Sequence, residues 1–149
     1  FVMADIPGLI EGAADGAGLG VQFLRHLSRT RLLLHLVDVS PYSDSGDPVR
    51  DAQVILGELA RYSVELAARE RWLVLNKLDL LPPEERAARV ATITTALGWT
   101  GPVFGIAALN GEGTEALINA VMECLEQRVE AAAGAMAEAG ASDVRPEDT

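Results

Sequence analysis

The chain has 149 residues and a formal net charge of -10 at pH 7, with 12 Lys and Arg against 22 Asp and Glu. A chain this acidic offers no basic face for phosphate backbones, and we expect no direct DNA binding. The single cysteine, Cys124, excludes a disulfide framework, and no apolar stretch approaches the length of a membrane span. Length and composition therefore favour one domain in the cytoplasm, without membrane contact.

Short apolar runs alternate with segments of helical periodicity along most of the chain. This alternation predicts an α/β fold with a doubly wound, mainly parallel sheet. The expected strands cover residues 1–4, 32–39, 72–75 and 102–106. The expected helices cover residues 21–28, a segment that begins at Asp47 and Pro48, a segment that opens near Pro83 and stops at Gly98, and residues 114–129.

The end of the chain has a different composition. From residue 130 onward it is rich in Ala, Glu, Gly and Asp and holds almost no large apolar side chains. Such a segment cannot bury enough surface to order itself. The sequence therefore predicts one domain over residues 1–129 and a mostly disordered acidic tail over residues 130–149.

Three polar side chains, Asn76, Lys77 and Asp79, follow the apolar run of residues 72–75. In an open α/β sheet, ligands bind outside the carboxyl ends of the strands, where these residues are expected. The carboxylate of Asp79 can accept two parallel hydrogen bonds from N1 and N2 of guanine, whereas adenine has no hydrogen on N1. The motif is short, and an ordinary polar turn between a strand and a helix is the alternative interpretation.

A second polar turn lies near the start of the chain, where Asp5 follows the apolar run of residues 1–4. Asp5 can hold a magnesium ion directly or through water. Gly8 lets a backbone amide approach a phosphate closely, because no Cβ intervenes. An Asp-x-x-Gly box followed much later by Asn-Lys-x-Asp is the order typical of GTPases.

Residues 11–20 carry four glycines among small side chains. Their spacing does not fit a dinucleotide fingerprint, which needs G-x-G-x-x-G directly after a strand. Two interpretations remain. The stretch is either a flexible connector or a switch loop that becomes ordered when magnesium and a γ-phosphate bind.

Four sequence runs, taken together, resemble the Obg family of GTPases. They are residues 5–13 (DIPGLIEGA), 16–20 (GAGLG), 23–26 (FLRH) and 33–38 (LLHLVD), and the resemblance extends over residues 1–128. It implies a P-loop NTPase-type fold, present here as a partial G domain. It also implies a monomeric enzyme that binds GTP or GDP with Mg²⁺, hydrolyses GTP slowly to GDP and phosphate, and acts in stress control and in assembly of the large ribosomal subunit.

The resemblance assigns three groups of residues to the nucleotide. The first is the magnesium and γ-phosphate box, with Asp5 as the metal ligand. The second selects guanine, and the third offers a backbone amide to the guanine O6 after the last strand. In chain order these residues are Asp5, Ile6, Pro7 and Gly8; Asn76, Lys77, Leu78 and Asp79; and Ala107, Ala108 and Leu109.

The sequence departs from the usual GTPase pattern in three places, of which the leucine at position 9 is expected of the Obg family. Ala107 stands where the third box has serine, so a hydroxyl is lost. Leu9 stands where many GTPases place a water-orienting glutamine, so we name no catalytic residue. No G-x-x-x-x-G-K-[ST] phosphate loop occurs, and Lys77 is the only lysine.

We therefore expect the phosphate loop and the family's N-terminal domain to lie upstream of Phe1. On this interpretation the chain is the C-terminal part of a longer GTPase and is inactive by itself. The alternative is a non-enzymatic, acidic α/β interaction module that derives from a GTPase and keeps the base-binding turn as scaffold.

Overall fold

The computed structural model describes residue 25, residues 29–43 and residues 46–141. These residues fall into two compact units, one that ends at Thr114 and one that begins at Glu115. The strand expected over residues 1–4 lies outside the described residues, as does all but Arg25 of the helix expected over residues 21–28.

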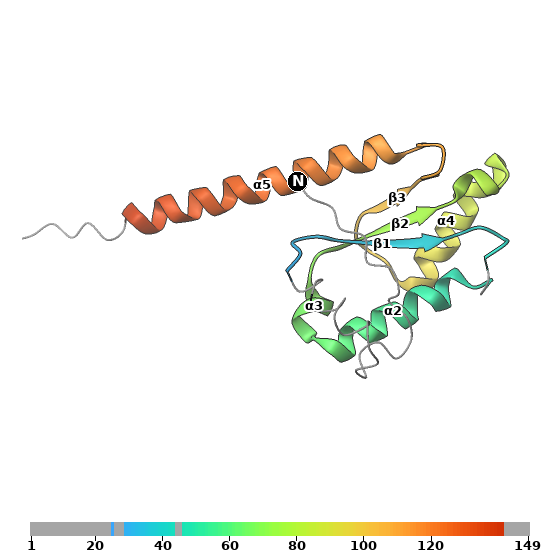
Figure 1. Ribbon diagram of the computed structural model, residues 1–149, viewed down its shortest axis with the longest axis horizontal. Helices are drawn as coiled ribbons and strands as arrows, with labels where there is room; N and C mark the ends of the chain where they lie inside the picture. Colours follow the sequence, from blue (N-terminus) through green and yellow to red (C-terminus); the bar gives the residue numbers. More distant parts are fainter. Residues whose placement is uncertain (1–24, 26–28, 44–45, 142–149) are drawn as a thin grey trace, which may run out of the picture. The chain divides into compact units, whose positions relative to one another are not determined.

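Three parallel strands form the sheet of the first unit, in the order β1-β2-β3 (Figure 1). They are β1 (Leu33–Asp38), β2 (Arg71–Asn76) and β3 (Val103–Gly105). The central strand is buried from Trp72 to Leu75, as expected of a strand covered on both faces. The predicted α/β fold class is confirmed, and each strand limit lies within one residue of the predicted one.

Helices cross over between the strands. Helices α2 (Pro48–Tyr62) and α3 (Val64–Ala68) connect β1 to β2, and helix α4 (Pro83–Leu97) connects β2 to β3. In Figure 1, α2 and α4 lie on the same side of the sheet, where one apolar core joins them to the strands. The buried members of this core are Val37, Val39, Ala52, Leu73, Leu75, Leu81 and Ile93.

Local sequence signals place the helix ends. The Asp47 side chain accepts a hydrogen bond from the amide of Arg50 at 3.0 Å, and Pro48 occupies the first turn of α2. Gly98 ends α4 with a left-handed φ of 61°. Helix α3 was not predicted, because its 5 residues are too few for a periodic pattern; the Ser63 hydroxyl caps its first turn.

Helix α5 (Thr114–Ala141) is 28 residues long and does not end near Val129 as predicted. The sequence predicts that residues 130–141 belong to the disordered tail, but they are helical. Their sequence lacks the apolar side chains that build a core, yet it is rich in alanine, the strongest helix former. Extending an existing helix avoids the cost of nucleation. Residues 142–149 of the predicted tail lie outside the described residues, and the division at residue 130 stays a prediction.

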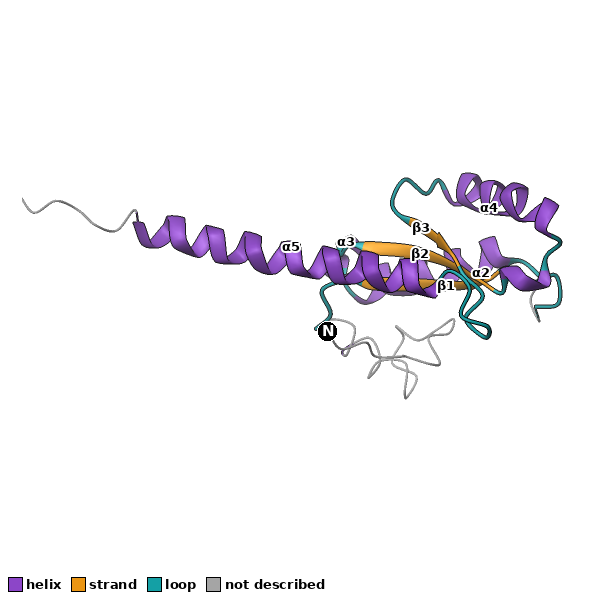
Figure 2. Ribbon diagram, turned by 90° about the horizontal axis from the view of Figure 1, so that it is seen from above, coloured by secondary structure: helices purple, strands orange, loops and turns teal. Residues whose placement is uncertain are grey.

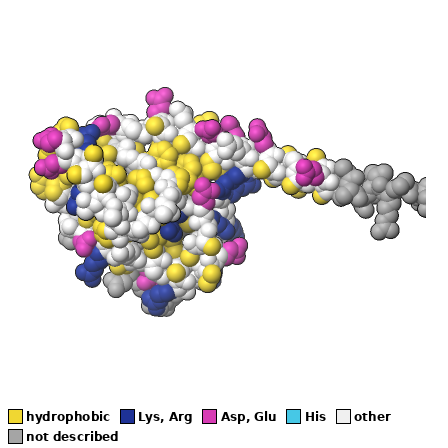
Figure 3. All heavy atoms as spheres, turned by 180° about the vertical axis from the view of Figure 1, so that it is seen from behind, with side chains coloured by type: hydrophobic (Ala, Val, Ile, Leu, Met, Phe, Trp, Pro, Cys, Tyr) yellow, Lys and Arg dark blue, Asp and Glu magenta, His cyan; other side chains and the backbone are white. Residues whose placement is uncertain are grey.

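The described surface mixes the two signs of charge. Figure 3 shows acidic and basic side chains interspersed over the face that it draws, without a continuous basic area of the kind that binds phosphate backbones. None of the helices in the described ranges combines the length and the apolar composition that a membrane crossing needs.

Candidate functional site

The predicted base-reading motif, residues 76–79, lies at the edge that the carboxyl ends of the strands form, and after that prediction this edge is called the base-reading edge. Asp38 at the end of β1 is the register partner of Asn76 at the end of β2. The chain that leaves β3 runs alongside, since the amide of Ile106 donates to the carbonyl of Leu75 at 2.8 Å. This edge is where an open α/β sheet binds its ligands.

Lys77 turns the chain sharply after β2. Its φ of 69° and ψ of 32° are left-handed, and it is the one non-glycine residue with positive φ in the described ranges. This conformation is unfavourable for a side chain that carries a Cβ. It is held by a 3.2 Å hydrogen bond from the Leu78 amide to the Ile106 carbonyl, and it leads into the short 3-10 helix Leu78–Leu80.

The Asn76 side chain joins two loops. Its Oδ1 accepts hydrogen bonds from the amide of Lys77 at 2.8 Å and from the amide of Ala108 at 3.0 Å. A carbonyl oxygen has two lone pairs, so both bonds can form at once. Asn76 therefore ties the base-reading turn to the loop that the sequence predicts as its partner.

A side chain that the sequence analysis did not assign to the site completes this edge. Asp38 Oδ2 lies 2.8 Å from Nζ of Lys77, and Asp38 Oδ1 accepts a hydrogen bond from the amide of Ser40 at 2.8 Å. The one available signal was the position of Asp38 at the end of a strand. That signal does not show which strand lies next to it.

Asp79 is exposed within the short 3-10 helix, and its carboxylate makes no hydrogen bond or ion pair with the described residues. The neighbouring Leu78 instead packs against the apolar core. A Cβ on Gly105 of β3 would lie 2.5 Å from Cδ1 of Leu78, so glycine leaves the room that this packing needs. The turn is thus anchored by Leu78 and presents Asp79 outward.

The loop after β3 is pinned at both ends. Ala107 is fully buried, and its amide donates to the carbonyl of Glu112 at 2.9 Å. The Glu112 carboxylate in turn receives a 2.8 Å hydrogen bond from Arg86 of α4. Ala108 and Leu109 between them are exposed. The Ala108 amide already donates a hydrogen bond to Asn76. A hydrogen bond to the O6 of a guanine base would therefore come either from this amide, shared between the two acceptors, or from the amide of Leu109.

The phosphate end of the predicted site, Asp5 to Gly8, lies outside the described residues. Within the described ranges, no group of three or more His, Cys, Asp or Glu side chains is placed to hold a metal ion. The assignment of Asp5 to Mg²⁺ and of Ile6, Pro7 and Gly8 to phosphate therefore stays a prediction.

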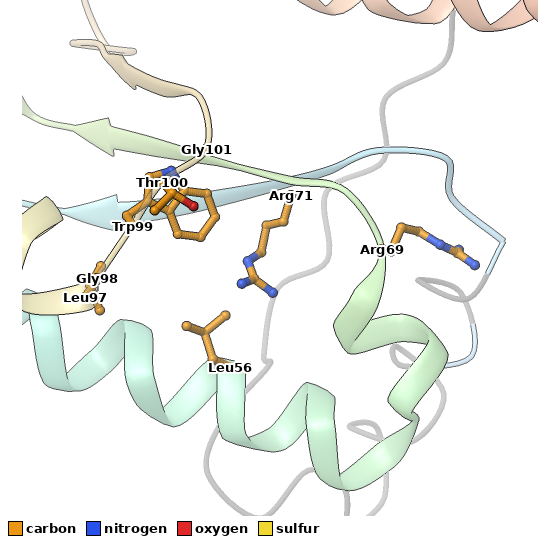
Figure 4. Close-up of a pocket in the computed structure, with 8 residues that line it drawn as sticks. All are labelled: Leu56, Arg69, Arg71, Leu97, Gly98, Trp99, Thr100 and Gly101. Carbon is orange, nitrogen blue, oxygen red and sulfur yellow. The ribbon is translucent and has the colours of Figure 1, made fainter.

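A cavity of about 370 Å³ opens at the opposite end of the sheet (Figure 4). The guanidinium of Arg71, at the start of β2, points into it and lies 5.2 Å from the ring centroid of Trp99. The side chain of Arg69 extends away from that pair.

Burial, together with the positive charge of Arg71, lowers the pKa of His35 to about 4. A half-buried cation beside an aromatic ring supports packing, and the residues that line the cavity are separate from the base-reading edge.

Comparison with known proteins identifies a GTPase family. The sequence model of a family described as 50S ribosome-binding GTPase matches residues 1–77. The match covers more than half of the 149 residues, including β1, α2, β2 and the first two residues of the base-reading motif. The chain therefore belongs to the family of 50S ribosome-binding GTPases.

Proposed function

We propose that this chain is part of an Obg-type guanine-nucleotide switch. The protein binds GTP and GDP with Mg²⁺, hydrolyses GTP slowly, and acts in the cytoplasm in stress control and in assembly of the large ribosomal subunit. Membership of the GTPase family supports binding and hydrolysis of GTP. The runs at residues 5–13 and 16–20 support the Obg type.

The observation that carries the proposal is the exposed carboxylate of Asp79 beside two residues whose side chains are held in place. Asn76 and Lys77 are held by hydrogen bonds and by an ion pair, whereas Asp79 has none to the described residues. A planar base with two adjacent donors satisfies such an acceptor. A site that pairs polar groups in this way discriminates against the wrong base by roughly 10⁴ or more.

The phosphates are bound at the other end of the nucleotide. Asp5 holds Mg²⁺, for which carboxylate oxygen is a preferred ligand, and Gly8 donates its amide to the γ-phosphate. When bound, Mg²⁺ neutralises charge that develops on the phosphate oxygens. Leu9 cannot orient the attacking water, so turnover is slow without a further factor.

Competition between nucleotides tests the proposal. Full-length protein is loaded with fluorescent GDP in Mg²⁺ and titrated with GTP, with xanthosine triphosphate (XTP) and with ATP. We expect GTP to displace the probe at concentrations roughly 10⁴-fold lower than ATP, with slow phosphate release that a chelator abolishes. Equal displacement by GTP and ATP contradicts the proposal. Failure to bind any nucleotide supports the non-enzymatic interaction module.

A further inference from the structure

We propose that Asp38 is a positioning residue for the nucleotide base, acting through Lys77. The inference rests on the proposed guanine-nucleotide function and adds a residue from a neighbouring strand to the base site. Asp38 fixes the ammonium group of Lys77 before the base arrives, so that the aliphatic stem of Lys77 is already extended where it would cover the base plane.

The carboxylate of Asp38 is itself fixed. One oxygen, Oδ1, accepts a 2.8 Å hydrogen bond from the backbone amide of Ser40, two residues further along the chain. The backbone of Asp38 pairs in register with Asn76 at the end of β2. The second oxygen, Oδ2, is therefore held at a defined place beside the base-reading turn, and it receives the Lys77 ammonium at 2.8 Å.

Both the backbone and the ammonium group of Lys77 are held in place. Its backbone is kept in the left-handed conformation while its amide donates to Asn76 Oδ1 at 2.8 Å. Its ammonium is held by Asp38. A free lysine side chain samples many rotamers, and fixing one of them in advance removes an entropic cost from ligand binding.

The same pair contributes little to folding. The side chains of Lys77 and Asp38 are 50% and 34% exposed, and ion pairs this open to water add little stability. The pair is also placed across two strand ends that the sheet already aligns. Its effect is therefore expected in nucleotide affinity and dissociation rate, with the melting temperature almost unchanged.

A double-mutant cycle in the full-length protein isolates this effect. Asp38→Asn keeps an oxygen for the Ser40 amide but removes the charge that holds Lys77. Lys77→Met keeps a straight apolar stem but removes the ammonium. Fluorescent GDP and GTP are titrated against the parent, both single variants and the double variant. Asp51→Asn, an exposed acid in the first turn of α2, is the matched control.

We expect Asp38→Asn to weaken GDP and GTP binding about threefold to tenfold, mainly through faster dissociation. In the Lys77→Met background the same change should have no effect, because the ammonium is already gone. Asp38→Glu keeps the charge and should restore part of the affinity. The Asp51→Asn control should bind like the parent.

Three results would overturn the inference. The first is parental affinity or tighter binding for Asp38→Asn. The second is an equal loss in the Lys77 and Lys77→Met backgrounds, because Asp38 would then act only through the Ser40 turn or the fold. The third is an Asp38→Glu variant no better than Asp38→Asn. An Asp79→Asn variant measured in parallel separates the two proposals: if it loses GTP affinity while Asp38→Asn does not, the guanine site stands and the role of Asp38 fails.

Discussion

Polar side chains lie at both ends of strand β2, but their interactions differ. At the carboxyl end, Asn76 and Lys77 make hydrogen bonds and an ion pair that shape an exposed turn. At the amino end, Arg71 lies over Trp99, and its Nε is buried without a hydrogen-bond partner among the described residues. A cavity of about 370 Å³ lies at the amino end. The proposed base site at the carboxyl end is indicated instead by its hydrogen bonds and by the exposed carboxylate of Asp79.

The largest expected effect is a loss of stability from a change at the carboxyl end of the sheet. Gly113 has a φ of 75°, and a Cβ there would collide with the backbone carbonyl of Gly105. Gly113→Ala should therefore lower the free energy of unfolding by at least about 3 kcal/mol, since the clash is with backbone in a conformation that alanine avoids. Denaturant unfolding of the full-length protein measures it.

Gly57→Ala is the control for that change. Gly57 lies inside α2 with no atom within 4 Å of the position its Cβ would take. Alanine there should stabilise the protein by roughly 0.5–1 kcal/mol, because it favours the helix. If both variants unfold at the same denaturant concentration, the tight packing described for the loop after β3 is wrong.

The second effect belongs to the amino end and depends on pH. The pKa of His35 is lowered from 6.5 to about 4 in the folded protein by burial, and further by Arg71. Between these values the unfolded chain binds more protons, so stability rises with pH. The contribution of neutral His35 to the free energy of unfolding is complete above about pH 6.5. On acidification towards pH 4 it is lost, and the loss amounts to about 2–3 kcal/mol. The free energy of unfolding, measured between pH 4 and 7, should rise with pH. His35→Gln should remove the part of this rise that comes from His35.

The smallest effect sharpens the contrast between the two ends. Arg71→Met keeps an apolar stem beside Trp99 and removes the cation, so we expect a stability loss of about 0.5–1 kcal/mol and unchanged GTP affinity. The pKa of His35, followed by NMR, should move back towards its ordinary value, since a positive neighbour is gone. A clear drop in GTP affinity at parental stability would show that the amino end takes part in nucleotide binding.

The sequence was sufficient to place the three described strands and two helix ends. Short apolar runs identified β1, β2 and β3, an Asp cap followed by Pro identified the start of α2, and a glycine identified the end of α4. The end of α5 differs from the prediction because residues 130–141 lack core-forming side chains, yet their alanines favour a helix without a core.

The geometry of the candidate site was predicted in part. The strand-end rule placed Asn76, Lys77 and Asp79 in a turn at the carboxyl edge of the sheet, where the structure has them. It could not reveal the contact of Lys77 with Asp38, or that of Asn76 with Ala108, because both pairings depend on which strands are neighbours and in what register. Sequence distance carries no information on that point.

The most direct test of the central claim, that Asp79 reads guanine, is the change Asp79→Asn in the full-length protein. The new amide offers one donor and one acceptor where the carboxylate offered two acceptors. Guanine N2 then faces another donor, whereas xanthine carries a carbonyl at that position and keeps its N1 proton. GTP and XTP are titrated against the parent, Asp79→Asn and the Asp51→Asn control.

We predict that Asp79→Asn loses about 2–4 kcal/mol of GTP binding free energy, roughly thirtyfold to a thousandfold in affinity, and comes to prefer XTP. The Asp51→Asn control should bind both nucleotides like the parent. If the parent and Asp79→Asn bind GTP equally well, Asp79 does not read the base and the account of this site is wrong.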